Sequence, residues 1–431
     1  MSTPPRNALE FLIDPIPRGD FLRDYWERRP LFVGRGQPDY FAELFSFDSL
    51  DALLARGDLW HPNVRVFLSG RQIPQEEFAS RWAYGREVHE RIVDRGRLIE
   101  LYEAGATVNV LGVERTWPTV TDCSKQLEID AGFPVHTTAF LSPPNAVNIP
   151  PHFDMTDVLV TQISGSKEWG LWEADRTLPL NSDTAGRIYG REDPRVGPGR
   201  LLGRHVLHPG DTLYVPRGVL HEAITTDEIS LHLAFGINVH RWYDLIEAAA
   251  RHAVARLADD EQARHALPVG FHRTKPVGTP AESVAHPMLQ TMTEHLASTM
   301  RAGLVEGLHT LDERYLNGRP ASRPRQLTDI AAAEDLTMSS RLVARPHLAH
   351  GIAPHNGRIR LVFHRKTLSF GTELRSALDF VAAGQPFAVS EIPDLTTHQR
   401  LEFAQRLLKE GFLTLDTNGG IGSASQGPSR E

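Results

Sequence analysis

Two stretches decide the fold that we expect for this chain: His152-Phe153-Asp154 and Gly210-Asp211-Thr212-Leu213-Tyr214-Val215-Pro216-Arg217-Gly218-Val219-Leu220-His221. Because side chains alternate across an extended strand, His152 and Asp154 point the same way. The second stretch reads as a Gly-Asp turn, a short strand and a Pro-Arg-Gly turn that carries His221 to the end of a hairpin. Two imidazoles and one carboxylate hold Fe(II) on one face and leave other coordination positions open. The pattern predicts a metal site at His152, Asp154 and His221 within β structure.

This metal pattern has a plainer alternative. The chain contains 20 histidines, so a His-x-Asp triplet is expected roughly once by accident in a chain of ordinary composition. A buried histidine that is hydrogen-bonded to Asp154 without any metal would satisfy both groups. The context favours the metal, because Pro150-Pro151 fixes the approach to the triplet and a hydrophobic strand follows it.

Bulk composition restricts the class of protein. A chain of 431 residues is expected to form two or three packed units, and its net charge of -8 argues against a protein whose main task is binding nucleic acid. The single cysteine excludes an intrachain disulfide and a cysteine-based zinc site. The first 20 residues lack the continuous apolar core of a signal peptide or membrane span. We therefore expect a soluble, cytoplasmic protein without a membrane partner.

Changes in composition along the chain predict its organisation. Helical spacing at Phe21 to Arg29 indicates a helical opening, and Gly85 to Ala104 is interpreted as one or two surface helices. From Ala106 to Ile237, short runs rich in Val, Thr, Phe and Leu are broken by Gly and Pro, as in a β-sandwich or barrel. Amphipathic helices are predicted at Trp242 to Leu257 and at Pro287 to Leu308.

The end of the chain has the pattern of a winged-helix module. Paired strands are expected at Arg358 to Phe363 and Lys366 to Phe370, and helices at Leu374 to Ala382 and Thr396 to Glu410. We therefore divide the chain into a β catalytic domain with a helical N-terminal cap at 1–240, a helical dimerisation domain at 241–345, a winged-helix domain at 346–418 and a disordered tail at 419–431.

For three of these segments, the sequence is compatible with two interpretations. The helices of the middle domain fit either a dimer interface or an intramolecular bundle. The last module is either a scaffold or a nucleic-acid reader, and its acidic residues favour the scaffold. The arginine-bearing segment from Leu178 to Gly203 is either a lid over a binding site or a surface loop.

Lys167 is the second candidate for chemistry. It opens a predicted strand directly after the turn Ser164-Gly165. A cation inside a small barrel is costly unless it meets an anion, and a bound dicarboxylate would supply one. The alternative is a lysine whose ammonium reaches water at the rim of the barrel. The pattern alone leaves both open.

The chain resembles the JmjC-type cupin oxygenases, specifically the ribosomal oxygenase group. The residues that carry the resemblance are Pro150 to Asp154, the strand Asp157 to Gly165, Lys167 with Trp169, Leu207 to Gly218 leading to His221, Ser230 to Leu233, and the opening Tyr25-Trp26 with Pro30-Leu31. The resemblance implies an α+β fold: a double-stranded β-helix of the jelly-roll, cupin type with N-terminal helices, a helical dimerisation domain and a C-terminal winged helix. In this reading His232 occupies a family position, although we interpret it as a buried core histidine with satisfied hydrogen bonds.

The resemblance also implies a chemistry. It implies an Fe(II)- and 2-oxoglutarate-dependent hydroxylase that uses O2, with His152, Asp154 and His221 as metal ligands. Lys167 would hold the distal carboxylate of 2-oxoglutarate. Members of the group hydroxylate an arginine or histidine side chain in ribosomal proteins and are homodimers, so a ribosomal protein and a second copy of this chain are the implied partners.

The chain departs from the family pattern upstream of the metal motif. Many members show Asn-x-Tyr where this chain has Thr138-Ala139-Phe140. A phenyl ring cannot donate the hydrogen bond of a tyrosine. We therefore expect co-substrate binding to depend on Lys167 and on a hydroxyl such as that of Thr138 or Thr161, or the substrate to differ from the usual ones.

Three functions fit these residues. The first is a peptidyl hydroxylase that acts on a ribosomal protein or another polypeptide. The second is a hydroxylase that tailors a small molecule or a peptide natural product, which the altered segment at Phe140 keeps open. The third is a non-catalytic cupin binding protein, and the complete set of predicted metal ligands argues against it.

Overall fold

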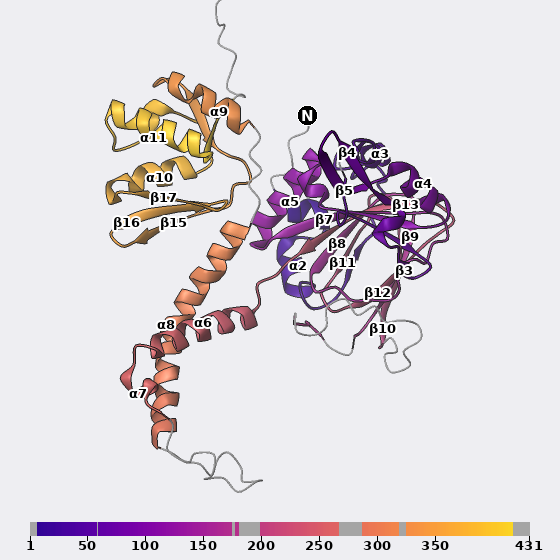
Figure 1. Cartoon of the computed structure of the whole chain (residues 1–431), viewed down its shortest axis with the longest axis horizontal. Helices are drawn as coiled ribbons and strands as arrows, with labels where there is room; N and C mark the ends of the chain where they lie inside the picture. The colour runs from indigo at the N-terminus through magenta and orange to yellow at the C-terminus, as the bar shows by residue number, and fades with distance from the viewer. Residues whose placement is uncertain are drawn as a thin grey trace, which may run out of the picture. The chain divides into compact units, whose positions relative to one another are not determined.

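The computed structural model describes residues 7–57, 59–174, 177–180, 199–266, 287–318 and 325–416. Within the chain, two compact units are distinguished, Met1–Val239 and His240–Glu431, and each is considered by itself (Figure 1). The predicted disordered tail at 419–431 and most of the predicted loop from Leu178 to Gly203 lie outside the described residues.

Three helices of the first unit begin at a capping side chain. Asn7 accepts a hydrogen bond from the Glu10 backbone N–H at the start of α1 (Ala8–Ile13), and Ser46 does the same for Ser49 at α3 (Phe47–Ala55). The other helices are α2 (Arg18–Asp24), α4 (Arg95–Glu103), capped by Asp94, and α5 (Pro118–Ala131), which has proline in its first turn.

An eight-stranded sheet forms one wall of the barrel, and all its pairs are antiparallel. Its strands, in spatial order, are β1 (Leu31–Val33), β11 (Thr212–Val215), β8 (Asp157–Ser164), β13 (Ser230–Ile237), β7 (Val135–Ser142), β6 (Thr107–Leu111), β2 (Val64–Leu68) and β3 (Arg71–Gln72). A three-stranded sheet holds β10 (Leu201–Leu207), β9 (Lys167–Trp172) and β12 (Leu220–Thr225).

The barrel strands are hydrophobic on both faces because both faces are buried. On β8, Leu159 belongs to the large core shared with the helices, while Val158 and Val160 belong to a second cluster. That second cluster also contains Trp169 and Leu171 of β9, so it joins the two sheets. The space between the sheets is therefore lined by alternate residues of each strand.

One predicted helical region is wrong. Within Gly85 to Ala104, residues Glu87–Val93 form β5, which pairs with β4 (Ala79–Tyr84) as an antiparallel hairpin, and only Arg95–Glu103 is helical. The pairing Tyr84 with Glu87 leaves a two-residue turn in which Gly85 takes a φ of +60°. A two-residue hairpin turn favours glycine, and this local signal outweighs the helical spacing of the apolar residues.

The helices of the second unit include α6 (Trp242–Leu257), whose bounds confirm the prediction, and α8 (Pro287–Gly318), which continues ten residues beyond the predicted end. They pack against each other (Figure 1). At their contact, a Cβ on Gly303 would lie 2.5 Å from the carbonyl oxygen of Ala249, so glycine is needed for this close approach. The remaining helices are α7 (Glu261–Arg264), α9 (Gln326–Ala332), α10 (Arg375–Ala382) and α11 (Thr397–Glu410).

Two small sheets complete the second unit. One pairs β15 (His350–His355), β16 (Arg358–Phe363) and β17 (Lys366–Phe370), and the other pairs β18 (Phe387–Ala388), β14 (Arg341–Ala344) and β19 (Leu413–Leu415). The hairpin of β16 and β17 confirms the predicted paired strands, whereas β14, β15 and β18 were not predicted.

In the part of the chain that the structure describes, no helix combines the length and apolar character needed to cross a membrane.

Candidate metal and anion site

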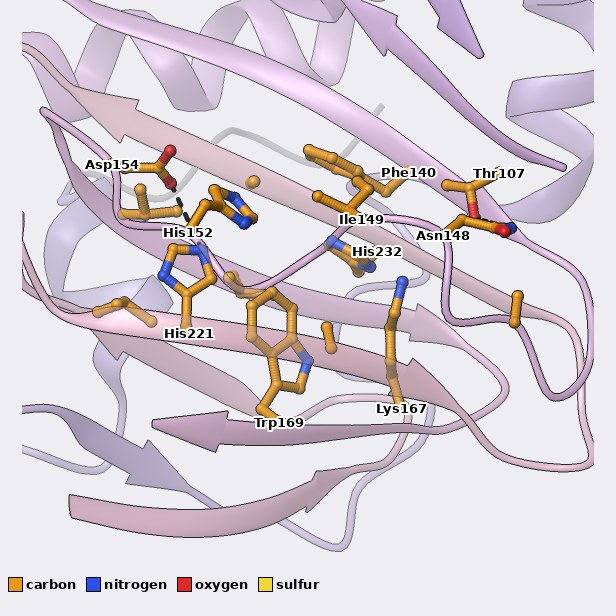
Figure 2. Close-up of a pocket in the computed structure, with 16 residues that line it drawn as sticks. Thr107, Phe140, Asn148, Ile149, His152, Asp154, Lys167, Trp169, His221 and His232 are labelled. Atoms are coloured by element: carbon orange, nitrogen blue, oxygen red, sulfur yellow. Dashed lines mark hydrogen bonds and ion pairs between the residues drawn. The ribbon is translucent and has the colours of Figure 1, made fainter. Parts of the chain in front are cut away.

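The three predicted metal ligands converge at one end of a pocket between the sheets (Figure 2). Backbone hydrogen bonds join the loop of His152 to β12: the His152 N–H donates to the His221 carbonyl at 3.0 Å, and the His221 N–H donates to the His152 carbonyl at 2.8 Å. One potential ligand atom from each of His152, Asp154 and His221 lies within 4.8 Å of the other two. The structure therefore brings these three residues together.

Hydrogen bonds to the backbone fix the orientation of both imidazoles. His152 Nδ1 lies 2.9 Å from the carbonyl oxygen of Pro150, and His221 Nδ1 lies 3.0 Å from that of Val219. A carbonyl oxygen only accepts, so each Nδ1 carries the proton and each Nε2 keeps its lone pair. Burial, and then the neighbouring His152, lower the pKa of His221 to about 4. Two imidazoles oriented in this way and a carboxylate are a donor set suited to a divalent metal.

Lys167 lies at the opposite end of the pocket and is only 4% exposed (Figure 2). Its ammonium donates to the hydroxyl oxygen of Ser142 at 3.0 Å. Burial lowers the pKa of Lys167 to about 7, and within the described residues no carboxylate forms an ion pair with it. A buried cation without an anion is costly, so this end of the pocket is suited to a carboxylate.

Lys167 is the end of a series of hydrogen-bonded polar side chains. The Asn148 side-chain N–H donates to Thr107 Oγ1 at 3.0 Å, and Thr107 donates to Ser142 Oγ at 3.0 Å. Because Ser142 Oγ accepts from both Lys167 and Thr107, its own proton is left to donate. Lys167 and Ser142 therefore offer two donors side by side.

Aromatic rings line the pocket between its two ends. Phe140 stacks on His232 with centroids 4.7 Å apart and planes 7° apart, and Trp169 meets His232 edge-on at 5.5 Å. Trp169 Nε1 and His232 Nδ1 are both buried without a hydrogen-bond partner among the described residues. His232 is thus buried as expected, but the expectation of satisfied hydrogen bonds is wrong. Unpaired buried nitrogens are polar contacts available to a ligand.

The structure does not bring the two predicted threonines to the wall of the pocket. Val158 and Val160 line it, so alternation turns Thr161 to the other face of β8. Thr138 shares a strand face with Phe140 but is not among the lining residues. The hydroxyl that contacts Lys167 belongs instead to Ser142, two residues beyond Phe140 on that same face. Alternation along β7 is the signal that could have identified it.

Comparison with known proteins finds relatives of part of this chain. Residues 115–245 match the JmjC domain model. The chain is 26% identical over 279 residues to the bifunctional lysine-specific demethylase and histidyl-hydroxylase NO66 of Aedes aegypti, covering 62% of this chain and 41% of that protein. It is 30% identical over 270 residues to ribosomal oxygenase 1 of Homo sapiens, covering 61% and 39%. The chain thus spans about two fifths of the length of these relatives.

Solved structures share the fold. A crystal structure of the Escherichia coli ribosomal oxygenase YcfD matches with a TM-score of 0.55 and 17% identity, covering 93% of this chain and 98% of that one. A structure of YcfD in complex with cobalt and 2-oxoglutarate matches with a TM-score of 0.52 and 17% identity, covering 93% and 99%. The prediction of a JmjC cupin fold with mixed helices and strands is confirmed. The chain carries a JmjC domain and is similar to the ribosomal oxygenases.

Proposed function

We propose that this chain is an Fe(II)- and 2-oxoglutarate-dependent oxygenase that hydroxylates an amino-acid side chain in a protein or peptide, with a ribosomal protein as the first candidate substrate. The observation that carries the proposal is the pairing, in one pocket, of a donor set for a divalent metal with a buried lysine that has no carboxylate partner among the described residues. The names of the relatives, ribosomal oxygenase and histidyl-hydroxylase, support this reaction class.

In this proposal His152 and His221 would hold the iron through Nε2, and Asp154 would hold it through a carboxylate oxygen. The bound iron would use O2 and 2-oxoglutarate to oxidise an unactivated C–H bond, with succinate and carbon dioxide as the co-products. The protein contributes fixed imidazole orientations, through the carbonyls of Pro150 and Val219. Asp154, whose side chain is 41% exposed, marks the end at which a substrate would enter.

Lys167 and Ser142 are proposed to hold the distal carboxylate of 2-oxoglutarate. A carboxylate here would restore the charge balance of the buried ammonium and accept the free hydroxyl proton of Ser142. Trp169 and His232 would contact the ligand along its length, and Val158 and Val160 would exclude water beside it. We keep Thr138, on the same strand face, as a secondary candidate, whereas Thr161 faces away.

Succinate formation tests this function directly. The purified chain is incubated with Fe(II), 2-oxoglutarate and ribosomal proteins extracted from a strain that lacks the gene, and the products are analysed by mass spectrometry. We expect succinate together with a mass gain of one oxygen on one ribosomal protein. Succinate without any modified ribosomal protein would favour a small-molecule or peptide natural product substrate, which Phe140 in place of the family tyrosine also favours. The absence of succinate would favour a non-catalytic binding protein.

We also propose that the chain is a homodimer through α6 and α8. Tyr243, Ile246 and Val254 recur at helical spacing on α6 and are 53%, 53% and 59% exposed, and Val305 and Leu308 of α8 are equally exposed. Exposed apolar side chains in such stripes are typical of helix–helix interfaces. Light scattering on the purified chain should give twice the monomer mass, and Ile246→Glu with Leu308→Glu should give the monomer.

The remaining assignments follow from the same resemblance. We propose a catalytic domain at 1–240, a helical dimerisation domain at 241–345, and a winged-helix domain at 346–418 that acts as a scaffold and not as a nucleic-acid reader. The cytoplasm is the proposed location, since ribosomal proteins are made there.

A further inference from the structure

We propose that Glu27 and Arg217 position the metal ligands Asp154 and His221, although neither residue lines the pocket. We call Glu27, Arg217, Asp157 and Tyr214 the Arg217 clamp. The inference rests on the proposed function and deepens it, because it makes the N-terminal segment part of the metal site. Glu27 and Arg217 are positioning residues and touch no reacting atom.

The first step is the burial of Arg217, which lies in the turn between β11 and β12 and is 5% exposed. Its Nε donates to Glu27 Oε1 at 2.6 Å, and its Nη1 donates to the Pro179 carbonyl at 2.8 Å. A buried guanidinium needs both its charge and its N–H groups matched. The side chain of Glu27 therefore holds the turn at residues 216–218 from outside the barrel.

The second step is the connection from this turn to the metal ligands. The Gly218 N–H donates to the Asp154 carbonyl at 2.9 Å, so the backbone of one ligand is bonded to the residue next to Arg217. Asp157, three residues after Asp154, accepts from the Tyr214 hydroxyl at 2.5 Å. His221 follows the turn by three residues and is bonded to His152 through both backbone groups. A shift of Arg217 therefore changes the relative positions of Asp154 and His221.

The third step is the backbone of Glu27. This non-glycine residue has a φ of +52°, in the left-handed region that side chains other than glycine rarely adopt. Its N–H donates to the Tyr214 hydroxyl at 2.8 Å, and the preceding Trp26 stacks on the Tyr214 ring at 5.9 Å. Backbone strain of this kind persists where surrounding contacts over-determine it, and it is often found at functional sites. The fold keeps a carboxylate at a position where glycine would be less strained.

The experiment measures metal binding, so it does not depend on turnover. Glu27→Gln and wild type are titrated with Co(II), and the affinity and the visible absorption spectrum of the bound ion are recorded. Loss of an outer contact that orients metal ligands typically weakens binding 10- to 100-fold, and we expect a loss of about 10-fold with an altered spectrum. The control is Glu173→Gln, which removes an exposed ion pair with Arg200 at 2.6 Å in the same unit and should bind Co(II) like wild type.

Glu27→Gly tests the role of the carboxylate with a less strained backbone. Glycine relieves the left-handed strain but leaves the buried guanidinium of Arg217 unpaired, so thermal unfolding should occur at a lower temperature than in wild type. Co(II) affinity, measured well below that temperature, should fall as in Glu27→Gln. Wild-type affinity and spectrum in either folded variant would overturn the proposal for the clamp and leave the proposed function intact. A wild-type chain that binds no Co(II) would overturn both.

Discussion

The two ends of the pocket differ in charge, exposure and construction. At the metal end, His152 and Asp154 are partly exposed and lie in one loop, joined to His221 by backbone hydrogen bonds. At the other end, Lys167 is almost fully buried and donates to Ser142, which in turn is hydrogen-bonded to Thr107 on another strand. One end is suited to a cation supplied by solvent, and the other brings a cation of its own.

This difference shows what kind of ligand the pocket fits. A molecule that binds a metal at one end and carries a carboxylate at the other satisfies both ends at once. It also implies that each end can be disrupted without the other, because among the described residues Lys167 donates to Ser142 and to no metal ligand. A substitution at one end should therefore leave binding at the other end intact.

The largest effect is expected from His221→Ala. Removing one of three ligands should lower Co(II) affinity more than 1,000-fold and abolish iron-dependent succinate formation, because two remaining ligands cannot hold the ion firmly. Folding should be largely unchanged by circular dichroism. His205→Ala is the matched control: that imidazole stacks on Phe32 at 4.7 Å and is not a pocket-lining residue. Retained metal binding in His221→Ala would contradict the assignment of this end.

The next effect is expected from Lys167→Met, which removes the charge and keeps a side chain of similar length. Hydrogen bonds to charged groups contribute about 1.5–3 kcal/mol, so 2-oxoglutarate affinity should fall about 100-fold in calorimetric titrations of the Mn(II)-loaded protein. Mn(II) affinity without 2-oxoglutarate should stay within twofold of wild type. An equal loss of metal affinity would show that the two ends are not separable.

A pH dependence should distinguish the ends further. Burial lowers the pKa of Lys167 to about 7, so the ligand-free protein loses the ammonium as pH rises through 7. Binding of a dicarboxylate requires that charge, and its affinity should be constant below pH 7 and fall by up to about tenfold per pH unit above it. Lys167→Arg keeps its charge over this range and should remove the slope. A slope of the same size in Lys167→Arg would assign the titration to another group.

The sequence predicts the metal end better than the anion end, and the reason is physical. The positions of His152 and Asp154 follow from alternation in an extended segment, and His221 follows from a turn with Pro and Gly, all of which are local. Ser142 and Thr107 are 35 residues apart, and Thr107 and Asn148 are 41 apart. Their contacts depend on which strands pair, and local propensity does not specify this.

The fold shows the same difference between elements that local sequence determines and elements that strand pairing determines. The helix Trp242–Leu257 and the hairpin of β16 and β17 have strong local periodicity, and their bounds were predicted. In contrast, β5 was mistaken for helix because Val88 and Ile92 are also spaced as on a helix face, and pairing with β4 decides the outcome. Thr161 was chosen for its hydroxyl, but the register of β8 turns it away from the pocket.

The smallest effect is expected from Ser142→Ala, which separates the contribution of the Ser142 hydroxyl from that of Lys167 at the same end of the pocket. The hydroxyl accepts from Lys167 at 3.0 Å and from Thr107 at 3.0 Å, so its own proton is available to a carboxylate. Loss of this single neutral donor should weaken 2-oxoglutarate binding about tenfold, since one such bond contributes about 1 kcal/mol and the Thr107 donor is also left unpaired. Thr161→Ala removes a buried hydroxyl from the opposite face of the same sheet and should leave the affinity unchanged. Equal losses in the two variants would mean that sheet stability, and not the hydroxyl of Ser142, sets the affinity.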